Sequence, residues 1–198
     1  MIKNKRLFYK LVSLLVVSFF VVLAILEVPS TNAFLKTADN KEVLSPIGDL
    51  KVELNDTNQI SDLTIGSLVD RTVTVENKTD TNMFVRLLIH PVLESKDGVY
   101  KPVSVEEVIP TISSDWIAGN DGYYYYKSKL GSHKETLPVF EKVTTSANME
   151  EEDTFKLLLK VEATTAKGDT YRQAWWEGKE PGDGSLKQVD DSLKGLKD

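Results

Sequence analysis

Residues 155–163, FKLLLKVEA, alternate between apolar and polar side chains, as a half-buried β-strand does. The intervening positions are charged except for Leu158. An extended chain places every second side chain on the same face, and here that face is apolar: Phe155, Leu157, Leu159, Val161 and Ala163. Residues 49–54 and 70–76 repeat the pattern more briefly, so the sequence predicts antiparallel strands with one face exposed.

A further segment, MFVRLLIH at residues 83–90, is apolar at both alternating positions apart from Arg86 and predicts a central strand. Pro91 follows it and should end the hydrogen-bonded ladder. Turn residues separate the strands at short intervals. We therefore expect an all-β fold, a two-sheet antiparallel β-sandwich or jelly roll, with short helical insertions at residues 105–112 and 141–153.

The amino-terminal 33 residues have the pattern of a signal peptide. Four basic residues among the first ten precede an uncharged apolar run at residues 11–26, and Pro29 ends it. We expect cleavage between Ala33 and Phe34, with an uncleaved membrane anchor as the alternative. The predicted organisation is a signal peptide (1–33), an extended segment (34–48), a β-sandwich domain (49–178) and a polar tail (179–198), in which apolar residues at helical spacing suggest only a short frayed helix.

Composition limits the partners of the exported chain. Removing residues 1–33 takes away four basic residues and one acidic residue, leaving 20 Lys and Arg against 29 Asp and Glu, a net charge of −9. Such a chain is a poor ligand for nucleic acid or an anionic membrane. The absence of cysteine excludes disulfides, which suits export from a Gram-positive cell.

The motifs of common enzymes are missing. The chain has two histidines, His90 and His133, and no His-Glu-x-x-His or Gly-x-Ser-x-Gly sequence. No residue set has the spacing of a calcium loop. The sequence therefore predicts no catalytic residue, no metal site and no cofactor.

An aromatic block, NDGYYYYK at residues 120–127, is the most unusual feature of the chain. Alternation places Tyr123 and Tyr125 on one face of a strand and Tyr124 and Tyr126 on the other. We expect one pair to enter the core near Trp116, across the turn at residues 119–122, and the other pair to point outward. The alternative is a polysaccharide platform that uses Trp116, Trp175 and Trp176.

These residues together resemble the TasA/camelysin group of Gram-positive biofilm matrix proteins, and in particular its BsaA-like branch. The front half of the resemblance is carried by Ile47–Leu54, Gly66, Val73–Asn77 and Phe84–Arg86. The back half is carried by Trp116, Asp121, Gly122, Tyr123, Tyr124, Tyr125, Tyr126, Lys127, Leu130, Thr136, Phe140, Val143, Glu162, Ala163, Ala174 and Trp175. The Trp116 and Asp121–Lys127 block is the most specific part.

The resemblance implies a jelly-roll-like sandwich, export through a dedicated SipW-type signal peptidase, and assembly into extracellular fibres by strand addition between copies. The donor strand would lie within residues 34–44, whose large apolar residues, Phe34, Leu35, Val43 and Leu44, lie at its two ends. We expect a secreted structural protein of the extracellular matrix or cell surface, whose partners are further copies of itself, with matrix polysaccharide as a further candidate partner. The alternatives are a carbohydrate-binding adhesin module and a camelysin-like secreted protease.

Overall fold

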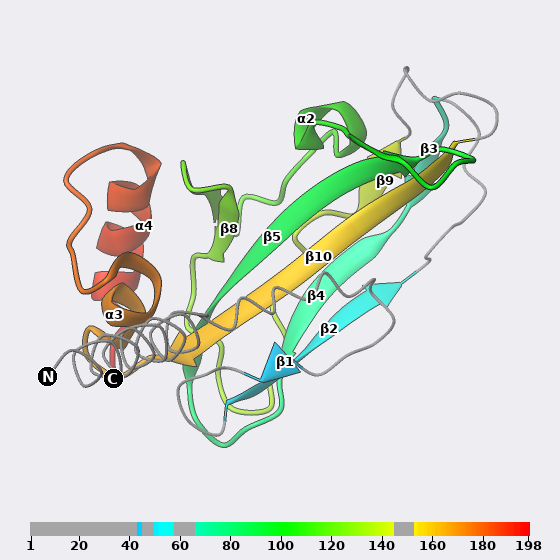
Figure 1. The fold of residues 1–198 in the computed structure, drawn as a ribbon. Helices are drawn as coiled ribbons and strands as arrows, with labels where there is room; N and C mark the ends of the chain where they lie inside the picture. Colours follow the sequence, from blue (N-terminus) through cyan, green and yellow to red (C-terminus); the bar gives the residue numbers. More distant parts are fainter. Residues whose placement is uncertain (1–42, 45–49, 58–65, 145–152) are drawn as a thin grey trace, which may run out of the picture. The chain divides into compact units, whose positions relative to one another are not determined.

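The computed structural model describes residues 43–44, 50–57, 66–144 and 153–198 (Figure 1). These residues form mainly antiparallel strands, part of which curl into a half-barrel, together with a few helices. The predicted all-β class is therefore confirmed. The expected signal peptide (1–33) and most of the extended segment (34–42 and 45–48) lie outside the described residues.

One sheet has the strand order β1-β2-β4, with β1 at Val43–Leu44, β2 at Lys51–Thr57 and β4 at Thr72–Asn77. Alternating apolar residues of β2 and β4 are buried, as their period-two pattern predicts. Beside β4, the short strands β3 (Leu68–Asp70) and β9 (Lys142–Thr144) pair with each other. Backbone hydrogen bonds also join residues 134–139 to β4, for example from Val139 N to Val73 O at 2.9 Å.

The other sheet has five strands, ordered β10-β5-β8-β7 with β6 paired to β5. Their bounds are β5 Met83–Glu94, β6 Tyr100–Pro102, β7 Trp116–Ala118, β8 Tyr123–Tyr126 and β10 Thr154–Thr165. β5 and β10 pair along twelve residues, from Met83 opposite Thr165 to Glu94 opposite Thr154. The FKLLLKVEA segment is thus the partner of the central strand, and Phe155, Leu157 and Val161 are buried.

Contrary to the sequence prediction, Pro91 does not end the ladder between β5 and β10. The N–H that proline lacks would not have pointed toward β10. The Pro91 carbonyl accepts a hydrogen bond from Val103 N at 3.1 Å. A strand residue directs its N and its C=O to the same side, so the Pro91 nitrogen faces the short strand β6. The ladder toward β10 therefore continues to Glu94.

The main core contains apolar side chains from both of the larger sheets. A hydrogen bond from Ser113 N to Val139 O at 2.8 Å joins the segment before β7 to residues 134–139, which run beside β4. Helix α2, Val105–Val108, lies within the expected helical insertion, and Ser104 Oγ caps it by accepting from Glu107 N. The second expected insertion is a strand at β9, and its residues 145–152 lie outside the described ranges.

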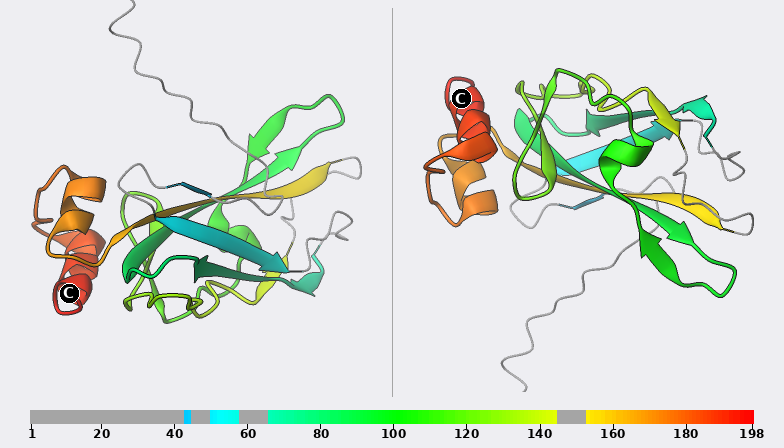
Figure 2. Two further views of the ribbon diagram at one scale, coloured as in Figure 1. Left: turned by 90° about the horizontal axis from the view of Figure 1, so that it is seen from below. Right: turned by 90° about the horizontal axis from the view of Figure 1, so that it is seen from above.

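Two helices, α3 (Thr170–Trp176) and α4 (Gly184–Lys194), cover the other face of the five-stranded sheet at one end (Figures 1 and 2). They enclose a second core of Phe84, Tyr125, Ala166, Tyr171, Val189 and Leu193. Val189 and Leu193 of α4 are each 1% exposed. The predicted polar tail at residues 179–198 is therefore wrong, because its helically spaced apolar residues pack onto the sheet instead of fraying.

Candidate functional site

The outer edge of β2 is the feature that bears most directly on assembly. Among the described residues, β1 pairs with β2 at two positions, Val43 opposite Val52 and Leu44 opposite Lys51. Among the described residues no other strand pairs with β2 on that side. Within the described part of the chain, residues 53–57 of β2 are thus an edge that an additional strand could extend.

The direction of the backbone groups on this edge follows from one hydrogen bond. Lys51 O accepts from Lys78 N at 2.9 Å, on the β4 side. Successive strand residues direct their backbone groups to opposite sides, so those of Val52, Leu54 and Asp56 face away from β4. The next backbone groups available for strand addition beyond Val52 are thus at Leu54 and Asp56.

The far end of β2 is held firmly by an ion pair. Arg71 donates from Nε to Asp56 Oδ1 at 2.9 Å and from Nη2 to Oδ2 at 2.6 Å. The two side chains are only 8% and 2% exposed. Two-point pairing fixes both orientation and distance, so an added strand would meet an ordered edge.

β10 is the edge strand of the other sheet and also contacts β2. The two sheet edges therefore lie near each other along one side of the main core. β10 carries Lys156 and Lys160 on its polar face, and lysine on an edge strand discourages unspecific pairing. β2 is the shorter of the two strands.

The aromatic block packs as the sequence predicted on one face of β8. Tyr124 and Tyr126 are buried in the main core beside Trp116. The Trp116 and Tyr126 rings lie 5.2 Å apart between centroids, and Trp116 Nε1 donates to Leu137 O at 3.1 Å. The predicted core stripe is confirmed, and a buried Trp116 cannot contribute to a surface platform for polysaccharide.

The other face of β8 differs from expectation, because Tyr125 is fully buried and Tyr123 half-buried, instead of both pointing into solvent. The centroid of the Tyr125 ring lies 5.4 Å from that of Trp175 and 6.0 Å from that of Trp176, both on α3. The Tyr125 hydroxyl donates to Asp121 Oδ2 at 2.5 Å. A glycine with φ of +85°, Gly122, completes the turn that places Asp121 beside this strand.

Arg86 joins the polar groups of this face into one network. It donates from Nε and Nη2 to Glu162 Oε2 at 2.9 and 2.7 Å, and from Nη1 to the Tyr125 hydroxyl at 3.0 Å. Its guanidinium carbon lies 3.8 Å from the centre of the Tyr123 ring, and Tyr123 donates to Glu162 Oε1 at 2.8 Å. The buried arginine of the MFVRLLIH strand thus has a charged partner and an aromatic partner.

The ionisation of this network is fixed near neutral pH. Burial alone would raise the pKa of Glu162, but hydrogen bonds from Lys160 and Arg86 outweigh it and hold that pKa below its usual value. Burial, and then donation to Asp121, raises the pKa of the Tyr125 hydroxyl. A general acid or base works best with a pKa close to the operating pH, and both shifts lead away from it. The network is suited to holding β5, β8 and β10 together.

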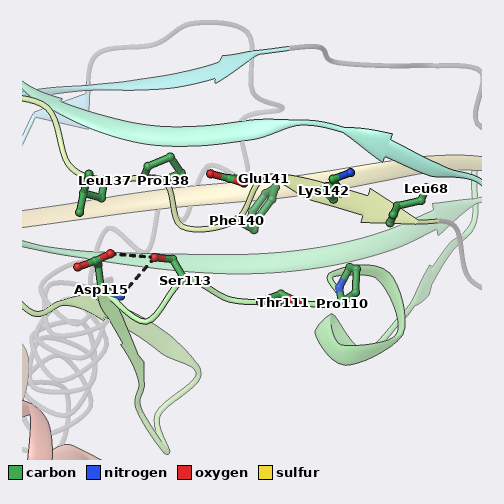
Figure 3. Close-up of a pocket in the computed structure, with 10 residues that line it drawn as sticks. All are labelled: Leu68, Pro110, Thr111, Ser113, Asp115, Leu137, Pro138, Phe140, Glu141 and Lys142. Atoms are coloured by element: carbon green, nitrogen blue, oxygen red, sulfur yellow. Dashed lines mark hydrogen bonds between the residues drawn. The ribbon is translucent and has the colours of Figure 1, made fainter.

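A groove of about 600 Å³ lies between the segment that precedes β7 and the segment that contains β9 (Figure 3). One wall carries Pro110, Thr111, Ser113 and Asp115, and the other carries Leu68, Leu137, Pro138, Phe140, Glu141 and Lys142. Leu68 and Leu137 are 56% and 52% exposed. Sequence reasoning missed this groove, because isolated apolar residues in loops have no periodicity.

Within the described ranges, no group of three or more His, Asp and Glu side chains is placed to hold a metal ion. No helix in those ranges is long and apolar enough to cross a membrane. No known protein family, no curated protein and no solved structure matches the chain. Of the expected donor residues, Phe34 and Leu35 lie outside the described residues, whereas Val43 and Leu44 form β1.

Proposed function

We propose that this protein is an exported structural subunit of an extracellular biofilm matrix or surface fibre, and that its copies join by strand addition. The observation that carries the proposal is the β1–β2 pairing, which the structure describes at two positions, with no described strand partner for the rest of the β2 edge. An open edge offers backbone donors and acceptors to a strand from another chain.

The donor in this proposal is the amino-terminal segment of a neighbouring copy. Each copy exchanges its own β1 for that of the neighbour and keeps the same register, in which Val43 lies opposite Val52. Continuing that register sets residues 38–42 opposite residues 53–57. Head-to-tail exchange joins two different surfaces, so it forms open filaments instead of closed dimers.

The finer architecture belongs to the same proposal. A main core with apolar side chains from both larger sheets and the hydrogen-bonded junction at Ser113 and Val139 support a jelly-roll-like sandwich that is closed on one side. The contact between β2 and β10 lies at the edges of the two sheets. A strand added to β2 there would shield this side of the core, which is the physical gain from assembly.

The test compares the mature chain, beginning at Phe34, with a chain that lacks residues 34–44, using negative-stain electron microscopy. The mature chain should form filaments, and the truncated chain should stay a folded monomer by circular dichroism and sedimentation. A removable amino-terminal tag supplies the matched control, since filaments should appear only after the tag is cleaved. Filaments of normal length from the truncated chain would refute strand addition.

Export is tested separately by mass spectrometry of the secreted protein. A mature chain that begins at Phe34 is expected, because Pro29 ends the apolar run and Ala33 is a small residue suitably placed after it. Retention of Met1 in a membrane fraction would show that the segment is an uncleaved anchor.

A further inference from the structure

We propose that the groove between Leu68 and Leu137 binds an extended peptide segment of another protein, in which Lys or Arg lies beside large apolar side chains. The groove is elongated. In Figure 3, Leu137 and Asp115 lie toward one end of it, and Leu68 and Pro110 lie toward the other. Its volume of about 600 Å³ is typical of a ligand-binding cleft.

The apolar wall of the groove is held in place by the aromatic block. Leu137 O accepts a hydrogen bond from Trp116 Nε1 at 3.1 Å, and Leu137 N donates to the Tyr126 hydroxyl at 3.4 Å. The Leu137 side chain nevertheless remains 52% exposed. Because its backbone is already fixed by two buried side chains, little entropy is lost when this leucine meets a partner.

The opposite wall is ordered as well. Ser113 Oγ accepts from Asp115 N and donates to Asp115 Oδ2, both at 3.2 Å. Ser113 N donates to Val139 O at 2.8 Å, which joins the two walls through their backbones. The groove is therefore formed before any ligand arrives, as binding clefts usually are.

The charges of the groove select a basic ligand. Asp115 contributes a carboxylate from one wall, and Glu141 contributes another from the opposite wall. Neither side chain has a basic partner in the part of the chain that the structure describes, and the hydrogen bond that Asp115 accepts comes from the neutral Ser113. Lys142, which also lines the groove, is paired with Asp70 at 3.5 Å. Two negative charges beside exposed leucines thus complement Lys or Arg next to apolar side chains.

A second copy of this chain is a poorer occupant than a basic protein. The exported chain has 20 Lys and Arg against 29 Asp and Glu, so two copies repel each other on average. The binding of a basic segment goes beyond subunit assembly, because it concerns a different partner. It also does not depend on strand addition, since residues 34–44 take no part in it.

The experiment selects ligands from a random heptapeptide library on the mature chain, which is immobilised through its amino-terminal tag. Enriched peptides should carry Lys or Arg beside Leu, Ile, Val or Phe. The most enriched peptide is then synthesised with blocked ends and titrated in a calorimeter, where we expect a dissociation constant of about 1–100 μM.

Two groove variants and two matched controls locate the binding site. Leu137→Ser and Glu141→Gln should each raise the dissociation constant, by about tenfold for the leucine and about threefold for the glutamate. Val99→Ser and Asp97→Asn, which change exposed residues of similar kind on the β5–β6 turn, should leave it unchanged. Melting temperatures should stay close to wild type for all four variants, because each of these side chains is exposed.

Salt dependence tests the role of charge separately. Binding by the wild-type chain should weaken as salt is added, and the double variant Asp115→Asn with Glu141→Gln should lose most of that dependence. Selection of peptides without basic residues, no enrichment over an unrelated protein, or equal binding by groove and control variants would each overturn the proposal.

Two further measurements would also overturn it by revealing a different occupant. One is self-association of the tagged chain that Leu137→Ser abolishes, which would make the occupant a second copy. The other is cosedimentation with phosphatidylglycerol vesicles that the same variant abolishes, which would make it a membrane. Loss of filaments on deletion of residues 34–44 tests strand addition alone, so the two proposals can fail independently.

Discussion

Arg172 of α3 holds Asp190 of α4 through two hydrogen bonds, 2.6 Å from Nε to Oδ1 and 2.7 Å from Nη2 to Oδ2. Asp190 is fully buried, and the Tyr171 hydroxyl also donates to its Oδ1 at 2.7 Å. The ring centroids of Phe84, on β5, and Tyr171 lie 5.5 Å apart. One buried carboxylate therefore fastens the last helix to α3, and α3 in turn to the central strand.

Replacing Asp190 with Ala should destabilise the fold by about 3–5 kcal/mol, because it removes the buried partner of Arg172 and Tyr171 and leaves Arg172 paired only with exposed carboxylates such as Glu180. Arg172→Met should have a similar effect for the same reason. The double variant Arg172→Met with Asp190→Leu should be much closer to wild type, since no unpaired charge remains. Urea unfolding of wild type, the two single variants and the double variant gives the free energy of unfolding of each. If the losses of the two single variants simply add up in the double variant, the two residues do not interact directly.

Acid should weaken the same part of the molecule. Burial opposes ionisation of Asp190, but hydrogen bonds from Arg172 and Tyr171 outweigh it and lower its pKa below the usual 3.8. The pKa of Glu162 is lowered from 4.5 by Lys160 and Arg86 against burial. A carboxyl whose pKa is lower in the folded state stabilises the fold above its unfolded pKa. That stabilisation is lost as the pH falls through the folded pKa.

We therefore measure the free energy of unfolding at about four pH values between pH 6 and pH 2. It should stay constant at first and fall below about pH 4.5. Glu162→Gln, which lowers stability near neutral pH, should make the fall shallower by removing one of the carboxyl groups whose pKa is lowered in the folded state. An identical pH profile for this variant and wild type would show that Glu162 contributes nothing to acid sensitivity.

The sequence predicted the strands well because burial on one face leaves a period of two, as at Phe155, Leu157 and Val161. It failed for the second face of the five-stranded sheet. Tyr125 was expected to point outward if Tyr124 entered the core, since alternation distinguishes the two faces without showing what covers each of them. The cover comes from α3 and α4, far along the chain.

Helix α4 was underestimated for a related reason. Val189 and Leu193 have helical spacing, but the intervening polar residues and the Gly and Pro residues at 178–184 resemble the end of a domain. The decisive contact joins Asp190 to Arg172, which are 18 positions apart and have no shared periodicity. The β2 edge and the groove were also missed, because both arise from tertiary pairing.

Truncation of the aromatic block tests the corrected packing. Tyr125→Ala and Tyr126→Ala should each cost about 3–5 kcal/mol, because both rings fill well-packed cores on opposite faces of β8. Tyr125→Phe should cost about 1–3 kcal/mol, since it leaves Asp121 and Arg86 without the hydroxyl. Tyr100→Ala, with its exposed ring, should stay within about 0.5 kcal/mol of wild type in thermal and urea unfolding. A mild effect at Tyr125 would mean that α3 and α4 do not cover it in solution.

The register of strand addition can be tested directly, because the chain has no cysteine of its own. The register of β1 on β2 places residue 42 opposite Glu53 once the pairing is continued beyond Val43 and Val52. The Val52 backbone faces β1, so the next pair is a non-hydrogen-bonded one, with Cα atoms about 4.5 Å apart. That separation is within the range that a disulfide spans.

Mature protein carrying Glu42→Cys and Glu53→Cys should therefore form disulfides between subunits when assembled filaments are oxidised. Denaturing gels without reductant should show a ladder of dimers and longer chains, which reductant collapses to the monomer. Glu42→Cys with Asn55→Cys, two residues out of register, should cross-link far less. If oxidised filaments contain only internally cross-linked monomers, each segment stays on its own β2 edge, and another contact must join the subunits.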